Sequence, residues 1–273
     1  MRNIRVDDVQ LQYETHGGGP PMLFIHGANL AGGLDALSRD PALTSQVRTI
    51  RYHRRGMSGS TRGTAPMTVE RQAEDALGLL DALGAERAHV LGYSYGGTVA
   101  LELAARAPAR LLSLSLLEPI LLAVPSAGAF MAAMASVNQL YAAGDVAGTV
   151  RALFEALGGQ SWRTLVEAAA GPGSIERAIV DTPIFFEAEA PSLGTWAPSA
   201  QGLKAVRCPV LSVRGTASGP IFIEGRALIH SWLPECIDVD IPGATHFLHL
   251  QEPQLVARAL AQFIKSSLTK SQA

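Results

Sequence analysis

The chain has 273 residues, of which 48% are hydrophobic and 17% are charged, and its formal net charge is −2. This composition supplies the apolar side chains for one large domain with a sizeable core, and it excludes a disordered chain. The small net charge, with Lys and Arg scattered along the chain, excludes the strongly basic character typical of nucleic-acid or anionic-membrane partners.

The cysteine content and the apolar runs of the sequence indicate the cellular compartment in which the protein is expected. Cys208 and Cys236 are too few to hold this domain together with disulfides, so we expect buried free thiols and a reducing compartment. The first eight residues lack the apolar segment of a signal peptide. The longest apolar run, residues 111–124, is interrupted by Glu118 and Pro119 and is too short to cross a bilayer. We therefore expect a cytoplasmic protein without a membrane partner, and either a monomer or a homodimer.

Strand and helix patterns alternate in the first 118 residues. Apolar or alternating runs predict strands at 2–6, 9–15, 22–25, 47–52, 87–91 and 111–117. A helical period of apolar residues predicts a helix over 68–83, which Thr68 caps and Gly84 ends. A second helix is expected from Gly97 to about Ala107, before Pro108.

Residues 119–203 differ from the rest of the chain. They contain Ala-rich helical stretches and several prolines but no convincing strand, so they predict a helical cap inserted into a core formed by residues 1–118 and 204–273. Strand patterns return at 209–214 and 237–241, and an amphipathic helix is expected over 253–268. The alternation predicts an α/β fold with a mostly parallel sheet covered on both faces.

The segment Gly92-Tyr93-Ser94-Tyr95-Gly96 has the pattern G-x-S-x-G between a predicted strand and a predicted helix. The glycines allow a tight turn, and a serine at its tip presents its hydroxyl at the carboxyl edge of the sheet. This pattern favours Ser94 as a catalytic nucleophile over a simple turn. Such a hydroxyl needs a base to remove its proton.

His246 is the predicted base, because it lies in the loop after the last predicted strand. Ligand sites of parallel sheets lie beyond the carboxyl ends of the strands, and Ser94 also lies at such an end. His249 is the alternative base, near the start of the final helix.

The acid that would orient the histidine is not where it is usually found. The loop 215–219 after the seventh predicted strand contains no Asp or Glu. From Ser94 the chain descends a helix of about 18 Å and climbs a strand of about 20 Å, so Glu118 should return to the level of Ser94. We predict Glu118 as the acid, and the alternatives are Asp238, Asp240 and Glu224. Its expected role is to orient the imidazole and to stabilise the imidazolium.

Two backbone N–H groups are predicted to form the oxyanion hole. The N–H of Tyr95 lies at the start of a helix, where such groups lack helical acceptors. The second predicted donor is the N–H of Ala28, in the loop after His26-Gly27.

These motifs resemble the α/β-hydrolase superfamily. The matching runs are His26-Gly27-Ala28-Asn29, Arg54-Arg55-Gly56-Met57-Ser58-Gly59-Ser60, Gly92-Tyr93-Ser94-Tyr95-Gly96-Gly97 and His246-Phe247-Leu248-His249-Leu250-Gln251-Glu252-Pro253. The resemblance implies an eight-stranded sheet with an antiparallel second strand and a cap after the sixth strand. Family members with the acid at the end of the sixth strand include some haloalkane dehalogenases, coelenterazine luciferases and zearalenone-type lactonases. Of these, the lactonases share the serine and glutamate pattern, whereas the other two use an aspartate nucleophile.

The leading interpretation is a serine hydrolase that cleaves a carboxylic ester or lactone through an acyl-enzyme intermediate. The alternatives are a C–C bond hydrolase, lyase or perhydrolase with the same triad, or a ligand-binding protein with weak catalysis. No metal or cofactor is expected, since the histidines lack ligand spacing and no phosphate-binding glycine loop follows a strand. We expect an apolar substrate pocket under the cap. Its candidate lining residues are Asn29, Phe130, Met131, Met134, Trp162, Phe185, Phe186 and Trp196.

Overall fold

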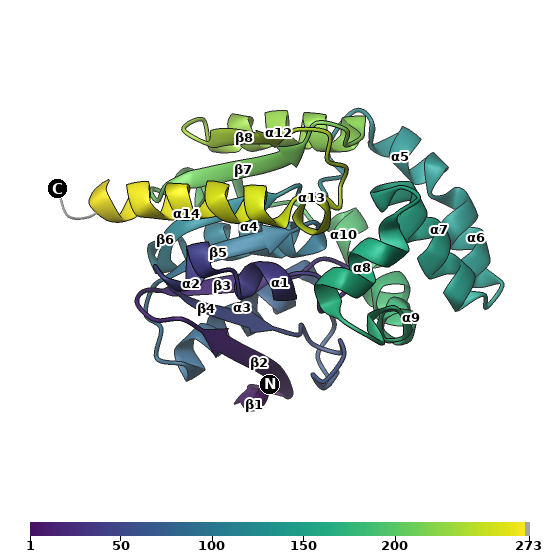
Figure 1. Cartoon of the computed structure of the whole chain (residues 1–273), viewed down its shortest axis with the longest axis horizontal. Helices are drawn as coiled ribbons and strands as arrows, with labels where there is room; N and C mark the ends of the chain where they lie inside the picture. The colour runs from purple at the N-terminus through teal and green to yellow at the C-terminus, as the bar shows by residue number, and fades with distance from the viewer. Residues whose placement is uncertain (271–273) are drawn as a thin grey trace.

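A computed structural model describes residues 1–270 and contains an eight-stranded sheet in the order β1-β2-β4-β3-β5-β6-β7-β8 (Figure 1). Its strands are β1 Arg2–Val6, β2 Val9–His16, β3 Pro21–Ile25, β4 Arg48–Tyr52, β5 Ala88–Tyr93, β6 Leu111–Leu117, β7 Val210–Gly215 and β8 Ile237–Ile241. β2 is antiparallel to both of its neighbours, and β3 to β8 are parallel. The predicted α/β class and mostly parallel sheet are confirmed.

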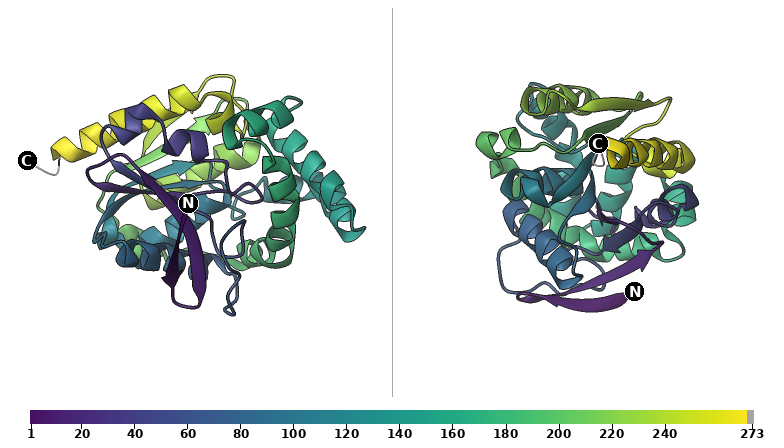
Figure 2. Two further views of the ribbon diagram at one scale, coloured as in Figure 1. Left: turned by 60° about the horizontal axis from the view of Figure 1, so that its bottom comes forward. Right: turned by 90° about the vertical axis from the view of Figure 1, so that its left-hand side faces the viewer.

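Helices cover both faces of the sheet because successive strand residues point to opposite sides. Leu23 and Ile25 of β3 pack with the helices α3, α4 and α12, whereas Met22 and Phe24 pack with α1, α2 and α14 on the other face. The N-terminal hairpin extends along one edge of the sheet (Figure 2). The helices that cover the two faces are α1 Asp35–Ser38, α2 Pro41–Thr44, α3 Val69–Ala82, α4 Tyr95–Arg106, α12 Pro220–Trp232 and α14 Pro253–Lys270. Two short helices, η1 Pro108–Arg110 and α13 Leu248–Gln251, lie in the connections.

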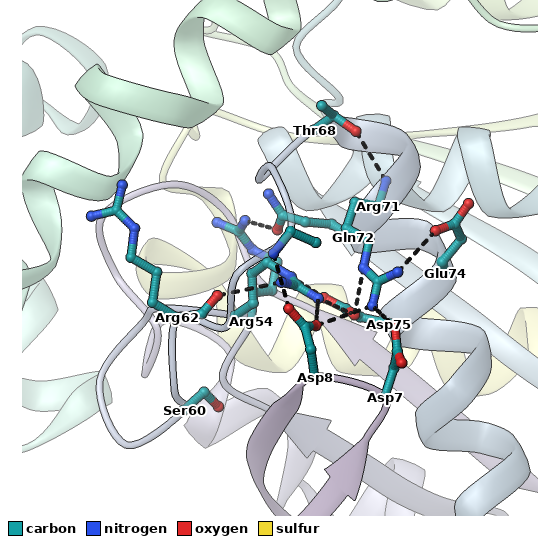
Figure 3. Close-up of polar contacts among 12 residues, drawn as sticks. Asp7, Asp8, Arg54, Ser60, Arg62, Thr68, Arg71, Gln72, Glu74 and Asp75 are labelled. Atoms are coloured by element: carbon teal, nitrogen blue, oxygen red, sulfur yellow. Dashed lines mark hydrogen bonds and ion pairs between the residues drawn. The ribbon is translucent and has the colours of Figure 1, made fainter.

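Helix α3 begins where the sequence indicates. The Thr68 hydroxyl accepts the Arg71 N–H at 3.1 Å, and Gly84 follows the helix with a φ of +66°. Arg71 also donates to Asp7 at 2.5 Å and to Asp8 at 3.2 Å, in the turn between β1 and β2 (Figure 3). These contacts attach the edge hairpin to α3.

The segment between β6 and β7 is helical, and residues 127–184 gather at one end of the sheet (Figure 1). Residues 200–204 instead pack beside Ala105 at the end of α4. We call residues 119–203 the helical insertion. It contains α5 Ala127–Ala133, α6 Ala135–Ala142, α7 Val146–Gly158, α8 Trp162–Ala170, α9 Ser174–Ile184, the π-helix η2 Phe185–Glu189 and α10 Ala190–Thr195. The last helix, α11 Ala200–Lys204, ends one residue beyond it. η2 precedes Pro191, which lacks the N–H that would bond to the carbonyl of Glu187 in an α-helix.

Both cysteines are free thiols. Cys236 is buried as expected, but Cys208 is only partly buried because it precedes β7 in a connection open to the surface. Within residues 1–270, every helix is too short or too polar to span a membrane.

Candidate active site

Ser94 lies at a sharp turn between β5 and α4, with φ 53° and ψ −121°. This backbone conformation is rare for a residue with a side chain, and it is typical of a strained functional turn. Both motif glycines are needed for the close packing here. A Cβ atom on Gly96 would lie 2.2 Å from the carbonyl oxygen of Ile25, and one on Gly92 would lie 2.3 Å from that of Gly96.

The structure brings Ser94, His246 and Glu118 together. Nε2 of His246 lies 3.0 Å from Oγ of Ser94, and Nδ1 lies 2.7 Å from Oε2 of Glu118. These are hydrogen-bond distances along one chain of three groups. Glu118 and His246 are each only 3% exposed, so their contact is shielded from water.

Glu118 contacts His246 although the loop after β7 contains no Asp or Glu, and that loop contributes a donor to Glu118. The N–H of Gly215 donates to Oε1 of Glu118 at 2.7 Å, which leaves Oε2 for the histidine. The Glu118 backbone itself has a φ of +43°, a second strained turn at the carboxyl edge of the sheet.

The alternative acids have other partners. Asp238 contacts His230 at 3.0 Å, and Asp240 accepts from Arg226 at 2.6 Å. Glu224 accepts the N–H of Ser126 at 2.7 Å. In the structure, only Glu118 among the four candidates hydrogen-bonds to His246.

Two aromatic rings hold the imidazole of His246. Phe222 stacks on it with the centroids 4.2 Å apart and the planes 12° from parallel, and Tyr93 stacks at 5.0 Å. The Tyr93 hydroxyl donates to the carbonyl of His246 at 3.0 Å. These contacts restrict the ring to the orientation that faces both Ser94 and Glu118.

The loop after β3 lies directly beside Ser94. A Cβ atom on Gly27 would lie 3.2 Å from Cβ of Ser94, and Ala28, Ser94 and Tyr95 all line the same cavity. Tyr95 is the first residue of α4, so its N–H has no acceptor within the helix. Ala28 and Tyr95 therefore lie beside Ser94 at the carboxyl edge of the sheet.

Arg54 connects this loop to the helical insertion. Its Nε donates to the carbonyl of His26 at 3.1 Å and its Nη2 to that of Gly27 at 3.0 Å. It also forms a buried ion pair with Glu189 of η2. A further hydrogen bond joins it to Gln72 of α3 (Figure 3). Burial lowers the pKa of His26 well below its usual value, and neutral Nε2 accepts the N–H of Arg54 at 3.0 Å.

Glu189→Ala is expected to lower the free energy of unfolding by about 3–5 kcal/mol, because it leaves the charge of Arg54 buried without its counterion. Urea unfolding followed by circular dichroism measures this. Glu187→Ala is the matched control: this neighbour is exposed, bonds only to the Tyr141 hydroxyl at 2.9 Å, and should change stability by less than about 1 kcal/mol. Equal effects of the two substitutions would contradict a structural role for the ion pair.

A cavity of about 130 Å³ lies between Ser94 and the helical insertion. Of the side chains proposed from the sequence, five line it, namely Phe130, Met131, Met134, Phe185 and Phe186. Other lining residues are contributed by the core, including Phe222 and Phe247.

Three of the proposed pocket residues lie elsewhere. Trp162 packs edge-on against Phe154 in the core of the insertion, 5.4 Å between centroids, and Trp196 donates to Glu102 of α4 at 2.9 Å. Asn29 lies within the loop after β3, is fully buried and is not among the residues that line the cavity. Composition alone could not distinguish core from cavity, because aromatic side chains serve both.

His246, and not the alternative base His249, hydrogen-bonds to Ser94 in the structure. His249 lies in α13, is 2% exposed and lines the cavity beside Tyr93, with their ring centroids 4.0 Å apart. His249 stands three residues after His246, and this spacing was the available signal in the sequence.

One group among residues 1–270 brings three metal-ligand types together. His230, Cys236 and Asp238 have ligand atoms within 4.8 Å of one another. Burial raises the pKa of the Cys236 thiol to about 12, and Asp238 is already engaged by His230 and lies 3.5 Å from Arg226. Since metal ligation requires a thiolate, this chemistry fits a cation poorly.

The parallel sheet, the strained serine turn and the histidine at the carboxyl edge together match the fold of the α/β-hydrolase class. The family model described as alpha/beta hydrolase fold matches residues 20–253. The chain belongs to this family.

Individual relatives match either a smaller part of the chain than the family model does or a large part at low identity. The "Putative carbamate hydrolase RutD" of Azorhizobium caulinodans is 37% identical over 111 residues, which span 41% of this chain and 42% of that protein. This chain therefore aligns with less than half of the length of that relative. 3-oxoadipate enol-lactonase 1 of Acinetobacter baylyi is 26% identical over 82% of this chain and 81% of its own. The structure of a thermophilic esterase from Thermogutta terrifontis superposes with a TM-score of 0.81 at 22% identity, covering 98% of this chain and 99% of that one.

Proposed function

We propose that this protein is a serine hydrolase that cleaves a carboxylic ester or lactone through an acyl-enzyme intermediate. The observation that carries the proposal is the continuous hydrogen-bonded chain from Ser94 through His246 to Glu118, with distances of 3.0 and 2.7 Å. In this chain Ser94 is the nucleophile, His246 the general base and Glu118 the orienting acid.

The reaction follows from the geometry. Nε2 of His246 takes the proton of Ser94 as Oγ forms a bond to the substrate carbonyl carbon. The resulting imidazolium then protonates the leaving alkoxide as the ester C–O bond breaks. A water molecule, deprotonated by the same ring, attacks the acyl-enzyme and releases the carboxylic acid and free Ser94. Glu118 accepts the Nδ1–H and stabilises the imidazolium in both steps.

The N–H groups of Ala28 and Tyr95 are the proposed oxyanion donors. Each lies in a backbone segment that reaches the cavity beside Ser94. Removal of one such donor typically lowers the rate by about 10²–10³-fold. Arg54 holds the Ala28 loop in place, because it donates hydrogen bonds to the carbonyls of His26 and Gly27, the two residues before Ala28.

The helical insertion is the proposed cap, and the remaining residues 1–118 and 204–273 are the proposed core domain. Side chains of α5, α6 and η2 meet those of the core around the cavity, so the insertion would select the substrate and exclude water. The proposed partner is a small molecule, and no cofactor is required by this mechanism.

The relatives support carbonyl substrates of this class. The Acinetobacter protein is named an enol-lactonase and the Azorhizobium protein a carbamate hydrolase. Attack by Ser94 on the carbonyl carbon would begin in the same way for a lactone and for a carbamate. The substrate panel should therefore contain both.

Labelling with a fluorophosphonate tests the proposal, because this probe reacts only with an activated serine. We expect one adduct, mapped by tandem mass spectrometry to the peptide that contains Ser94, and no adduct in Ser94→Ala. An unlabelled wild-type protein would exclude the whole class of serine-dependent mechanisms. Initial rates on aryl esters, lactones, carbamates and vinylogous diketones then separate ester or lactone cleavage from C–C bond hydrolysis.

A further inference from the structure

The cavity above Ser94 is apolar and carries no formal charge. Within the described residues, its lining contains no Lys, Arg, Asp or Glu. Transfer of a carboxylate or ammonium group into such a site, without a counterion, costs several kcal/mol. The lining therefore favours an uncharged substrate.

Few polar groups face the cavity, and most are engaged. Ser94 and His246 bond to each other, and the Tyr93 hydroxyl donates to the carbonyl of His246. The Tyr95 hydroxyl accepts from Gln72 at 3.1 Å. Asn138, on the cap, is exposed to solvent. His249 is the remaining polar side chain of the lining.

His249 is buried without a hydrogen-bond partner. It is 2% exposed, and neither Nδ1 nor Nε2 has a partner among the described residues. Burial, with a smaller contribution from His246, lowers the pKa of His249 to about 3, so its ring is neutral at pH 7 and offers one donor and one acceptor. A buried polar group left unpaired costs about 1–3 kcal/mol, which a phenylalanine in the same ring packing would avoid.

We infer that His249 hydrogen-bonds a neutral polar substituent on the otherwise apolar acyl group of the substrate. The inference rests on the proposed function and specifies its substrate class. It follows from the position of the ring in the lining of the cavity that contains Ser94 and from its two unpartnered nitrogens. The ring packs 4.0 Å from Tyr93, which also stacks on His246, so its position is set by the same aromatic group that holds the proposed base.

The cavity volume guides the size of the acyl group in a probe. At about 130 Å³ it is close to the roughly 150 Å³ cavity that binds benzene in an engineered protein. A single ring with one hydroxyl or carbonyl substituent fits this space. Methyl phenylacetate and its 2-, 3- and 4-hydroxy isomers are therefore suitable probes, and methyl 4-carboxyphenylacetate is the charged comparison.

The test compares wild-type protein with His249→Phe and His249→Gln on these five esters, with hydrolysis followed in a pH-stat at pH 7.5. We expect the wild type to hydrolyse at least one hydroxylated isomer with a kcat/KM at least tenfold above that of the unsubstituted ester. In His249→Phe, the ratio of kcat/KM for that isomer to kcat/KM for the unsubstituted ester should fall to about one. His249→Gln should retain part of the preference, because its amide still donates and accepts. The carboxylated ester should be the poorest substrate of the five.

The other outcomes distinguish a failure of the inference about His249 from a failure of the proposed function. Equal losses of kcat/KM on all esters in His249→Phe, with thermal unfolding unchanged, would overturn the inference in favour of a purely structural ring. A wild type that labels with fluorophosphonate but shows no preference for any hydroxylated isomer would also overturn it, while the proposed nucleophile would stand. A wild type that neither labels nor hydrolyses any ester would overturn the proposed function itself.

Discussion

Ser94→Ala is expected to lower kcat by about 10⁶-fold, the order of magnitude found when the nucleophile of a serine triad is removed. Without Oγ no acyl-enzyme forms, and the proton relay through His246 and Glu118 has no group to activate. The fold should persist, since the backbone turn at Ser94 is imposed by the close approaches at Gly92 and Gly96. Single-turnover and steady-state rates on the best ester of the panel measure the loss, and urea unfolding measures the stability.

Ser115→Ala is the matched control for this substitution. Ser115 lies on the adjacent strand β6, is 1% exposed and is not part of the cavity lining. We expect its activity to stay within about twofold of the wild type. Residual activity above about 1% in Ser94→Ala, beyond any trace of wild-type enzyme, would exclude Ser94 as the nucleophile.

Glu118→Gln is expected to lower kcat by about 10⁴-fold with little change in stability. The amide oxygen can still accept the N–H of Gly215, so the local backbone contact is retained. The amide nitrogen then donates toward Nδ1 of His246, which favours the tautomer with its proton on Nε2, and this tautomer cannot accept the Ser94 proton. The imidazolium also loses its negative partner.

A steady-state pH profile of kcat for Glu118→Gln, next to the wild type, measures this effect. Glu224→Gln, whose carboxylate accepts the N–H of Ser126 away from the triad, should retain wild-type activity. If Glu118→Gln kept kcat within tenfold of the wild type, the histidine would be oriented by another group. The stacking of Phe222 and Tyr93 would then be the first alternative to examine.

Much of the candidate site could be predicted because its signals are local. The serine turn needs a strand, a helix and small residues within a few positions, and the sequence from Ala88 to Ala105 contains all of them. The position of Glu118 followed from the nearly equal lengths of one helix and one strand. The register of β5 and β6 agrees with that estimate, since Tyr93 pairs with Leu117. The residues that follow this pair are Ser94 and Glu118.

The cap side chains could not be assigned from the sequence. Trp162 and Trp196 have the same apolar character as Phe185 and Phe186, but only the latter two line the cavity. Helix orientation decides this, and it depends on packing among α7, α8 and α9 and on the π-helix before Pro191. The ion pair between Arg54 and Glu189 joins residues 135 positions apart, so no local pattern indicates it.

By itself, the sequence determined the alternation of strands and helices, the carboxyl-edge positions of Ser94 and His246, and the absence of an acid in loop 215–219, because each depends on neighbouring residues and on regular chain geometry. Only the tertiary structure decided that Gly215 binds Glu118 and that Arg54 connects the Ala28 loop to the helical insertion. It also decided that His249 lines the cavity with neither nitrogen bonded to any residue that the structure describes. Those contacts join distant segments, and they depend on how whole helices pack against one another.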